Sequence, residues 1–300
     1  MPRQYGVHND HMLPGLRRLV QAAHLGGAKI ALQIVHAGMN SIYIHRIGLT
    51  AMAVSSMKER SRPHREMTDE DVEGIISGFA SAAIRAREAG FDAIQLHGAH
   101  GYLLSQFISP LFNHRTDRWG GSTENRRRFH LELVSRVHQA IGDDFPLLIK
   151  FGVQDDREGG LSLNEGLETA QQMVHRGIDA IEVSTGVAFE RATPIVKKGD
   201  PEHLPFRERT AALKRSIEVP VILVGGIRSL QTAENVVDSG DTDLVSMCRP
   251  FIREPNLINR WHGGDKEPAR CLSCNECLTI LAQGIPMECG QLNRKNEETG

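Results

Sequence analysis

Residues 220–227 read PVILVGGI, and residues 243–250 read DLVSMCRP. Each stretch contains a short apolar run, which is typical of a strand buried on both faces of a parallel sheet. Glycine lets the backbone approach a phosphate group closely, and arginine binds phosphate through paired hydrogen bonds. Barrel enzymes often hold a phosphate between the loops after strands seven and eight. The two stretches therefore favour a TIM-type (β/α)8 barrel, with Gly225, Gly226 and Arg249 placed to contact a phosphate.

Four earlier apolar runs have the same character, and amphipathic stretches separate them. Thr68, followed by acidic residues, marks one helix start, and Ser162 with Glu165 forms a capping box at another. Repeated strand–helix units predict an α/β protein with a parallel sheet. An open sheet and a closed barrel both fit this alternation, and the two stretches above favour the barrel. The four runs are Lys29–Val35, Phe91–Leu96, Pro146–Phe151 and Ala180–Ser184.

The barrel that this strand count implies is incomplete. If residues 220–227 and 243–250 hold strands seven and eight, Lys29–Val35 is strand three. The residues before it predict one helix and no strand, and a barrel without its first two strands exposes sheet edges. Either something else supplies the missing part, or the chain is an incomplete gene product. We predict a partial β/α barrel over residues 1–265 and a short cysteine-rich C-terminal segment over residues 266–300.

The composition excludes several classes of protein. The chain has 300 residues, a formal net charge of −2, 40% apolar residues and 24% charged residues, which suits a folded protein with a large core. Near-neutral charge argues against nucleic acid as the main partner. The densest basic run, Arg126–Arg128, is interpreted as the solvated face of a helix. No apolar run approaches the roughly 20 residues of a membrane helix, and no signal peptide is recognisable. We expect no membrane partner and a cytoplasmic location.

The strongest chemical signal lies in residues 95–107, QLHGAHGYLLSQF, directly after a predicted strand. Active sites of β/α barrels lie at the carboxyl ends of the strands. His97, His100 and Tyr102 would place hydrogen-bonding groups around one small space there. Two other interpretations stay open. The histidines satisfy backbone groups of a loop, or they bind zinc, for which no third ligand stands at a recognisable spacing.

The following residues carry a family resemblance. Residues 107–122 read FISPLFNHRTDRWGGS, and residues 125–129 read NRRRF. They resemble the Old Yellow Enzyme signature F-x-S-P-x-x-N-x-R-x-D-x-[YW]-G-G-S-x-x-N-R-x-R-F, and the histidine stretch is similar to that family's H-x-x-H/N-x-Y. Residues 33–38, QIVHAG, are similar to its Q-L-x-H-x-G. The resemblance extends from about Tyr5 into the cysteine-rich tail.

The resemblance implies an oxidoreductase that holds FMN at the strand ends. Gln33 would hydrogen-bond the pyrimidine edge of the flavin, and the Lys150 cation would stabilise the negative charge of reduced flavin near N1 and C2=O. A lysine inside an apolar run is costly without an anionic partner. Nothing here matches the Pro and the small hydroxyl or cysteine residue that the family's first strand brings to the flavin. The phosphate would lie against Gly225, Gly226, Cys248 and Arg249, and the family usually has glycine where Cys248 stands.

The resemblance also implies catalytic and substrate-binding roles for His97, His100 and Tyr102. The histidines would hold the carbonyl or nitro oxygen of an activated alkene such as an enone, and their hydrogen bonds would strengthen as enolate-like charge develops. Tyr102, whose ordinary pKa of about 10 keeps it protonated at neutral pH, would give a proton to the α-carbon. Flavin N5 would deliver hydride to the β-carbon. NAD(P)H would reduce FMN at the same face, in a ping-pong cycle.

The cysteines are concentrated near the C-terminus in a C-x2-C-x2-C-x11-C pattern. Such crowding in a cytosolic chain favours metal ligation over disulfides. The iron–sulfur branch of the family, related to 2,4-dienoyl-CoA reductase, has three residues between its second and third cysteines, whereas only Asn275 and Glu276 stand there in this chain. A [4Fe–4S] cluster, a zinc ion and no metal all stay open. The four residues are Cys271, Cys274, Cys277 and Cys289.

Two rival functions stay open. Another phosphate-binding barrel enzyme, such as an aldolase or isomerase, would use Lys150 for a Schiff base and would leave the histidines and the tyrosine idle. A truncated, non-catalytic barrel fragment, or a metal-binding module built on the cysteine tail, would catalyse no reaction. The oligomeric state is also open, with a homo-oligomer as one alternative. The choice between NADH and NADPH also stays open, as does the identity of the physiological acceptor.

Overall fold

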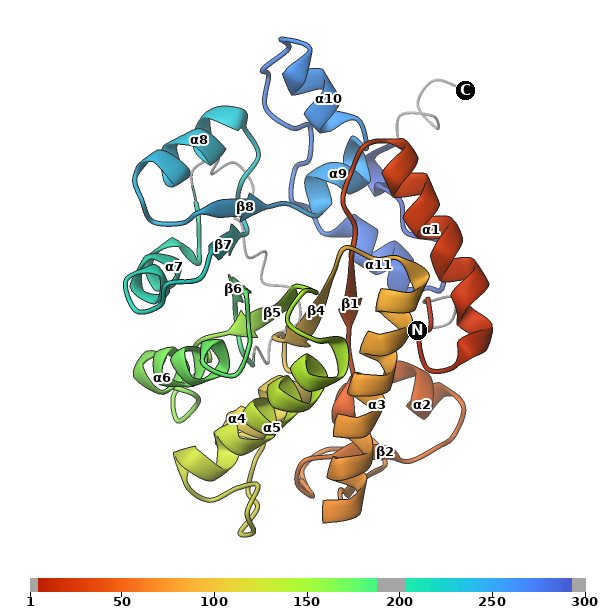
Figure 1. Cartoon of the computed structure of the whole chain (residues 1–300), viewed down its shortest axis with the longest axis vertical. Helices are drawn as coiled ribbons and strands as arrows, with labels where there is room; N and C mark the ends of the chain where they lie inside the picture. The colour runs from red at the N-terminus through yellow and green to blue at the C-terminus, as the bar shows by residue number, and fades with distance from the viewer. Residues whose placement is uncertain (1–4, 188–202, 293–300) are drawn as a thin grey trace. The chain divides into compact units, whose positions relative to one another are not determined.

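A computed structural model describes residues 5–187 and 203–292 (Figure 1). The described residues divide into two units. The first comprises residues 5–187 and 215–220, and the second comprises residues 203–214 and 221–292. The predicted boundary between residues 265 and 266 stays a prediction.

Strands and helices alternate through the first unit, as the sequence predicts. Thr68 and Ser162 each cap a helix, and Asp71 and Glu165 complete the two capping boxes. The elements in chain order are η1 (Asp10–Met12), α1 (Leu13–Leu25), β1 (Ala31–Ile34), η2 (Gly38–Asn40), α2 (Ile42–Arg46), β2 (Ala51–Ala53), β3 (His64–Glu66), α3 (Asp69–Ala89), β4 (Ala93–Gly98), α4 (Leu103–Ile108), α5 (Thr123–Ile141), β5 (Leu147–Gly152), α6 (Leu163–Val174) and β6 (Ala180–Ser184).

Four parallel strands form the main sheet of the first unit, in the order β1-β4-β5-β6. The register places Gln33 opposite Gln95, His97 opposite Lys150, and Lys150 opposite Glu182. Register partners share a face of the sheet, as do residues two apart along a strand. These five polar side chains therefore lie on one face. Helix α3 contacts β1 and β4, and α5 lies beside α3 (Figure 1).

The expectation that every strand is buried on both faces is wrong for β1. Its residues Ala31 and Gln33 are exposed, whereas all residues of β6 are buried. Within the described residues β1 pairs only with β4. An end strand lacks the neighbour that covers a central one. Gln33 is consequently open to solvent on the face that carries His97 and Lys150.

The second unit contains the last two predicted strands, β7 and β8, which pair in parallel with Ile222 opposite Leu244. Leu244 is exposed, so the expectation of full burial is wrong for β8 as well. Leu257, Trp261 and Ala269 form a small buried core against which Met247 and Phe251 pack. The elements are α7 (Arg207–Lys214), β7 (Val221–Val224), α8 (Leu230–Asp238), β8 (Leu244–Ser246), α9 (Arg249–Arg253), α10 (Leu257–His262) and α11 (Glu276–Ala282).

The signature residues after β4 bind backbone carbonyl groups. The Asn113 side-chain amide donates to the carbonyls of Phe107 and Trp119, both at 2.7 Å. The buried Arg115 guanidinium donates to the carbonyls that follow β2 and β3, Val54 at 3.0 Å and Met67 at 2.7 Å. Buried carbonyl groups need such partners, because leaving one unpaired costs free energy. The signature therefore holds the loops around α4 in place.

The interpretation of Arg126–Arg128 as a solvated face is wrong for its first two residues, which are 8% and 4% exposed. Arg126 donates to the Ile108 carbonyl at 3.1 Å and pairs with Glu165 at 2.8 Å. Arg127 pairs with Glu168 at 2.5 Å. Arg126 and Arg127 are buried beside carbonyl and carboxylate groups of neighbouring elements, which offset the cost of burying their charges.

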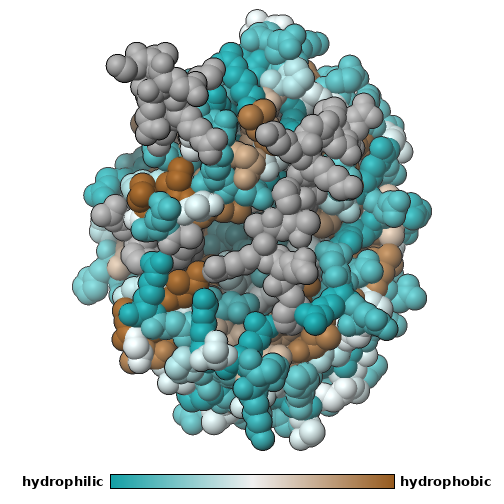
Figure 2. Space-filling model, turned by 180° about the vertical axis from the view of Figure 1, so that it is seen from behind, coloured by the Kyte–Doolittle hydropathy of each residue, from teal (hydrophilic) through white to brown (hydrophobic). Residues whose placement is uncertain are grey.

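The face shown in Figure 2 is mostly hydrophilic, with hydrophobic residues gathered in small separate groups. Within the part of the chain that the structure describes, no helix combines the length and the apolar character that a membrane crossing requires. The predicted cytoplasmic location and the oligomeric state stay predictions.

His130 on α5 is a fully buried histidine with an unusual environment. Its ring lies 5.9 Å from the ring of Phe151, and neither ring nitrogen has a hydrogen-bond partner among the described residues. Burial lowers the pKa of His130 to about 3. The ring is therefore neutral in the folded protein over a range in which the unfolded chain, with a pKa of about 6.5, binds a proton.

We predict that His130→Phe flattens the acid limb of the stability curve. Above about pH 6.5 the imidazole is neutral in both states and contributes no pH dependence. Between about pH 6.5 and pH 3 only the unfolded chain gains the proton. The free energy of unfolding therefore decreases as the pH is lowered, and at pH 5 this one group has reduced it by about 2 kcal/mol relative to pH 7. Urea unfolding at pH 7 and pH 5 measures the difference between parent and variant. The exposed His175→Gln is the control, and an equal pH dependence in parent and His130→Phe would refute the assignment.

Candidate active site

The three aromatic residues singled out in the sequence come together at the carboxyl end of β4. The His97 ring centroid lies 5.0 Å from that of His100 and 5.1 Å from that of Tyr102, and both ring pairs meet nearly edge to face. His97 is the fifth residue of β4, and Tyr102 precedes α4 directly. The sequence prediction that these residues surround one small space is consistent with this arrangement.

The chain achieves this grouping with an unusual turn, which we call the histidine loop (residues 97–102). His100 and Gly101 have φ angles of 62° and 71°, in the left-handed region. That conformation costs a residue other than glycine about 1–2 kcal/mol. Hydrogen bonds offset this cost. Asn40 and Gln106 both donate their side-chain amides to the Gly101 carbonyl, at 2.8 and 2.7 Å. The His100 N–H donates to the Thr185 carbonyl at 3.1 Å.

His97 is buried and is an uncharged hydrogen-bond donor. Burial, followed by the charges of His100 and Lys150, lowers the pKa of His97 to about 3. The Ala99 N–H points at His97 Nδ1 at 3.3 Å, so Nδ1 acts as the acceptor. A neutral imidazole with an accepting Nδ1 carries its proton on Nε2. His97 therefore has an Nε2–H group with which to donate.

His100 lies against a serine that the sequence did not indicate. Its Nε2 is 2.7 Å from the Oγ of Ser184, the buried last residue of β6. Desolvation and the Lys150 charge lower the pKa of His100 to about 4. Because the His100 side chain is open to solvent, water reduces the desolvation, and we expect its pKa to be depressed less than that of His97. Both rings are neutral at neutral pH.

Lys150 lies in a row of polar side chains across the sheet, which is buried at Glu182 and open to solvent at Gln33. Its Nζ is 2.6 Å from Glu182 Oε1, and the two side chains are 12% and 9% exposed. Gln95 Nε2 donates to Glu182 Oε2 at 2.9 Å, and Gln33 Nε2 donates to Gln95 Oε1 at 2.5 Å. The anionic partner that a lysine needs inside an apolar strand is thus a residue of the protein itself, Glu182. Sequence reasoning missed it, since only the strand register brings it opposite Lys150.

The predicted phosphate ligands lie in the second unit. Gly225 and Gly226 have φ angles of 94° and 88°, and a side chain on Gly226 would collide with the His203 carbonyl. Both positions therefore require glycine. Cys248 is exposed. The guanidinium of Arg249 donates to Asn275 Oδ1 at 2.7 Å, so in this structure it points at the cysteine-rich segment.

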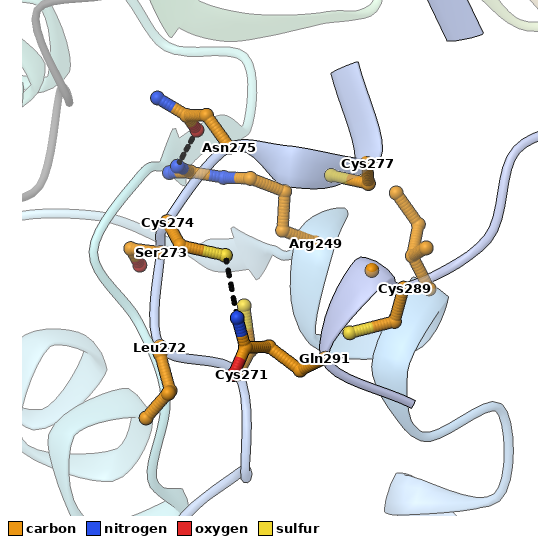
Figure 3. A pocket seen from close by; sticks show the side chains of 11 residues that line it. Arg249, Cys271, Leu272, Ser273, Cys274, Asn275, Cys277, Cys289 and Gln291 are labelled. Carbon is orange, nitrogen blue, oxygen red and sulfur yellow. Dashed lines mark hydrogen bonds between the residues drawn. The ribbon is translucent and has the colours of Figure 1, made fainter. Parts of the chain in front are cut away.

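The four C-terminal cysteines line one small pocket of about 20 Å³, together with Arg249 and Gln291 (Figure 3). The Gln291 amide donates to Cys274 Sγ at 3.8 Å and to Glu276 at 3.0 Å. Burial raises the pKa of the Cys277 thiol, which opposes the thiolate form that a metal ligand needs. Within residues 5–187 and 203–292, no three His, Cys, Asp or Glu side chains are grouped closely enough to hold a metal ion. The [4Fe–4S] cluster and the zinc ion stay predictions.

Comparisons with known proteins agree with the motifs. A sequence model of the NADH:flavin oxidoreductase / NADH oxidase family matches residues 1–267. The chain is 36% identical over 275 residues to a protein named NADH oxidase from Thermoanaerobacter brockii, covering 91% of this chain and 42% of that protein. It is 32% identical over 294 residues to a protein named cinnamate reductase from Clostridium sporogenes, covering 90% of this chain and 44% of that protein.

A solved structure of 2-naphthoyl-CoA reductase in complex with 2-naphthoyl-CoA has the same fold. Its TM-score is 0.87 at 28% identity, covering 95% of this chain and 46% of that chain. The predicted fold class, a partial β/α barrel, is confirmed. The chain spans less than half the length of these three proteins.

We predict that Lys150 and Glu182 are energetically coupled. Lys150→Met and Glu182→Leu should each destabilise the protein by about 3–5 kcal/mol, because each leaves an uncompensated buried charge. The double variant should lose less than either single variant, since it buries no charge. Urea unfolding of the parent, the two single variants and the double variant measures the free energies of this double-mutant cycle. Asp144→Asn breaks the exposed pair with Arg87 and should cost less than about 1 kcal/mol. Additive losses in the double variant would contradict a buried ion pair.

Proposed function

Because the chain belongs to the NADH:flavin oxidoreductase / NADH oxidase family, we propose that it uses NAD(P)H and FMN to reduce activated carbon–carbon double bonds. The resemblance to Old Yellow Enzyme inferred from the sequence is confirmed by this membership. The acceptor in the proposal is an α,β-unsaturated carbonyl or nitro compound.

Several features of the chain suit an FMN of this kind. Gln33 and Lys150 would hold the flavin ring, and the lysine has N–H donors beyond the one directed at Glu182. Gly225, Gly226, Cys248 and Arg249 would hold the phosphate, since successive left-handed glycines offer backbone N–H groups with no side chain in the way. When bound, FMN would supply the hydride-transfer chemistry between NAD(P)H and the β-carbon of the alkene.

The residues of the histidine loop would bind the acceptor and supply the proton. His97, with its proton on Nε2, would donate to the carbonyl or nitro oxygen of the acceptor, and His100 would be the second donor. Neutral donors suit this task because they strengthen their hydrogen bonds as negative charge develops, without holding the ground state as an ion pair. Tyr102 would give its proton to the α-carbon, which balances the hydride received at the β-carbon. NAD(P)H is oxidised, and the double bond is reduced.

The single observation that carries this proposal is the grouping of His97, His100 and Tyr102 at the end of β4, with Lys150 opposite His97 on the neighbouring strand. A Schiff-base enzyme would need Lys150 as a neutral nucleophile. Instead, its Nζ is held by Glu182 Oε1 at 2.6 Å, which ties the amine to a carboxylate of the protein. The observation therefore favours the reductase over an aldolase. The cysteine segment takes no part in the proposed reaction.

Tyr102→Phe should separate the two halves of the reaction. Loss of a positioned general acid costs about a hundredfold or more in rate, so we predict that alkene reduction slows by at least this factor while flavin reduction by NAD(P)H stays nearly unchanged. Stopped-flow absorbance of the flavin measures each half-reaction. Phe keeps the aromatic ring and is a conservative change. If flavin reduction and alkene reduction slow by the same factor, Tyr102 is not the general acid.

His97→Ala and His100→Ala should weaken the binding of phenols to the FMN-loaded protein. A phenolate oxygen resembles the enolate oxygen of the acceptor, and a charge-assisted hydrogen bond is worth about 1.5–3 kcal/mol. We therefore expect dissociation constants to rise about tenfold or more for each substitution, as measured by spectral titration. His175→Gln, at an exposed position, is the control. Unchanged phenol affinity in both alanine variants would reject the two histidines as oxygen ligands.

A further inference from the structure

The end of β6 contacts His100 at two points. The Thr185 carbonyl accepts the backbone N–H of His100 at 3.1 Å, and the Oγ of Ser184 lies 2.7 Å from the ring Nε2. Ser184 is the last residue of β6 and is 1% exposed. The proposed reaction uses His100 as a hydrogen-bond donor, and it gives Ser184 no role.

The segment that carries Ser184 is held in place by a buried carboxylate, Asp155, which is 4% exposed. Its Oδ1 accepts the Val187 N–H at 2.6 Å, and its Oδ2 accepts the Ser109 hydroxyl at 2.6 Å. A buried carboxylate with several donors fixes the backbone that supplies them. The Ser184 hydroxyl therefore meets the His100 ring from a well-defined backbone.

The direction of this hydrogen bond follows from the partners that each group has. A hydroxyl carries one proton to donate, and a neutral imidazole has one donor nitrogen and one acceptor nitrogen. Among residues 5–187 and 203–292, His100 Nε2 is the one hydrogen-bond partner of Ser184 Oγ. If His100 were the donor, the buried serine O–H would have no acceptor there, which costs free energy. The serine is therefore the donor and Nε2 the acceptor.

We propose that Ser184 is a positioning residue that fixes His100 as the tautomer with its proton on Nδ1, and thereby sets which nitrogen donates to the acceptor oxygen. His97 is the opposite tautomer, because its Nδ1 accepts the Ala99 N–H and its proton lies on Nε2. The two rings, 5.0 Å apart and nearly edge to face, thus offer two different N–H groups. The part of this inference that concerns the acceptor rests on the proposed function, whereas the tautomer does not.

A fixed tautomer suits the proposed reaction. An imidazole that exchanges between its two neutral forms has its proton on a given nitrogen only part of the time. Donors that are already in place when negative charge develops stabilise that charge without reorganisation. The hydroxyl of Ser184 supplies this constraint from a neighbouring strand.

The first experiment detects the tautomer in the full-length, flavin-free chain. In ¹⁵N-labelled histidine the protonated and the bare ring nitrogen differ widely in chemical shift, and the signals missing from His100→Ala assign that ring. We expect Nε2 to be the bare nitrogen of His100 and Nδ1 that of His97. Ser184→Ala should average the two His100 shifts and leave His97 unchanged, and Ser184→Thr, which keeps a hydroxyl, should preserve the parent pattern.

Ser105→Ala is the matched control. Ser105 is also 1% exposed, and its hydroxyl has no hydrogen-bond partner in the part of the chain that the structure describes. Its loss should leave both histidine patterns unchanged. A parent His100 with its proton on Nε2, or with averaged shifts, would overturn the inference. So would a His100 pattern that Ser184→Ala leaves unchanged or that Ser105→Ala alters equally.

The second experiment measures the consequence for an acceptor-like ligand, with phenol as the probe and the FMN-loaded protein. Ser184→Ala should raise the dissociation constant about threefold to tenfold, the range of one ordinary hydrogen bond, and Ser184→Thr should restore it. In a chain that already carries His100→Ala, the same substitution should change it by less than about twofold, because the serine acts through the ring.

An equal rise in both backgrounds would show that Ser184 acts independently of His100 and would contradict the positioning role. A protein that takes up no FMN would instead contradict the proposed function. The tautomer measured without flavin would still decide whether Ser184 sets the proton of His100.

Discussion

The candidate site depends on the hydrogen bonds that hold the histidine loop in a left-handed turn. His100 adopts a conformation that costs a residue with a side chain about 1–2 kcal/mol, and the side-chain amides of Asn40 and Gln106 offset that cost by donating to the Gly101 carbonyl. Without this turn, β4 would send His100 and Tyr102 in unrelated directions. With it, three rings meet within about 5 Å. Backbone strain that surrounding groups maintain is common where chemistry takes place.

The strand register then provides the charge beside those rings. Lys150 and Glu182 face each other on neighbouring strands, and His97 lies opposite Lys150. Positive charge near the imidazoles helps to keep them neutral, as the lowered pKa values of His97 and His100 reflect. The same strand register thus gives Lys150 its carboxylate partner and helps to keep the two imidazoles neutral. The strand residues Lys150 and Glu182 thus contribute both to the stability of the sheet and to the chemistry of the neighbouring histidine loop.

Much of the fold was predictable from the sequence, because apolar runs and helix caps are local signals. Ala180–Ser184 is the same strand in prediction and structure, and Thr68 and Ser162 cap their helices as expected. The contacts of Ser184 with His100 and of Glu182 with Lys150 could not be predicted from the sequence. Each depends on how strands that are distant in sequence align in the sheet. The burial of Arg126 and Arg127 was missed for a related reason. Whether a guanidinium is buried depends on carbonyl and carboxylate groups that other elements supply.

The most direct measurement is a titration of the flavin-free chain with FMN, followed by flavin absorbance and fluorescence. The account predicts saturable binding of one FMN per chain, with a shifted flavin spectrum, and weaker binding in Lys150→Met, which removes the cation proposed to contact the ring. A spectrum identical to that of free FMN at every protein concentration would contradict the central claim that this face of the sheet holds a flavin.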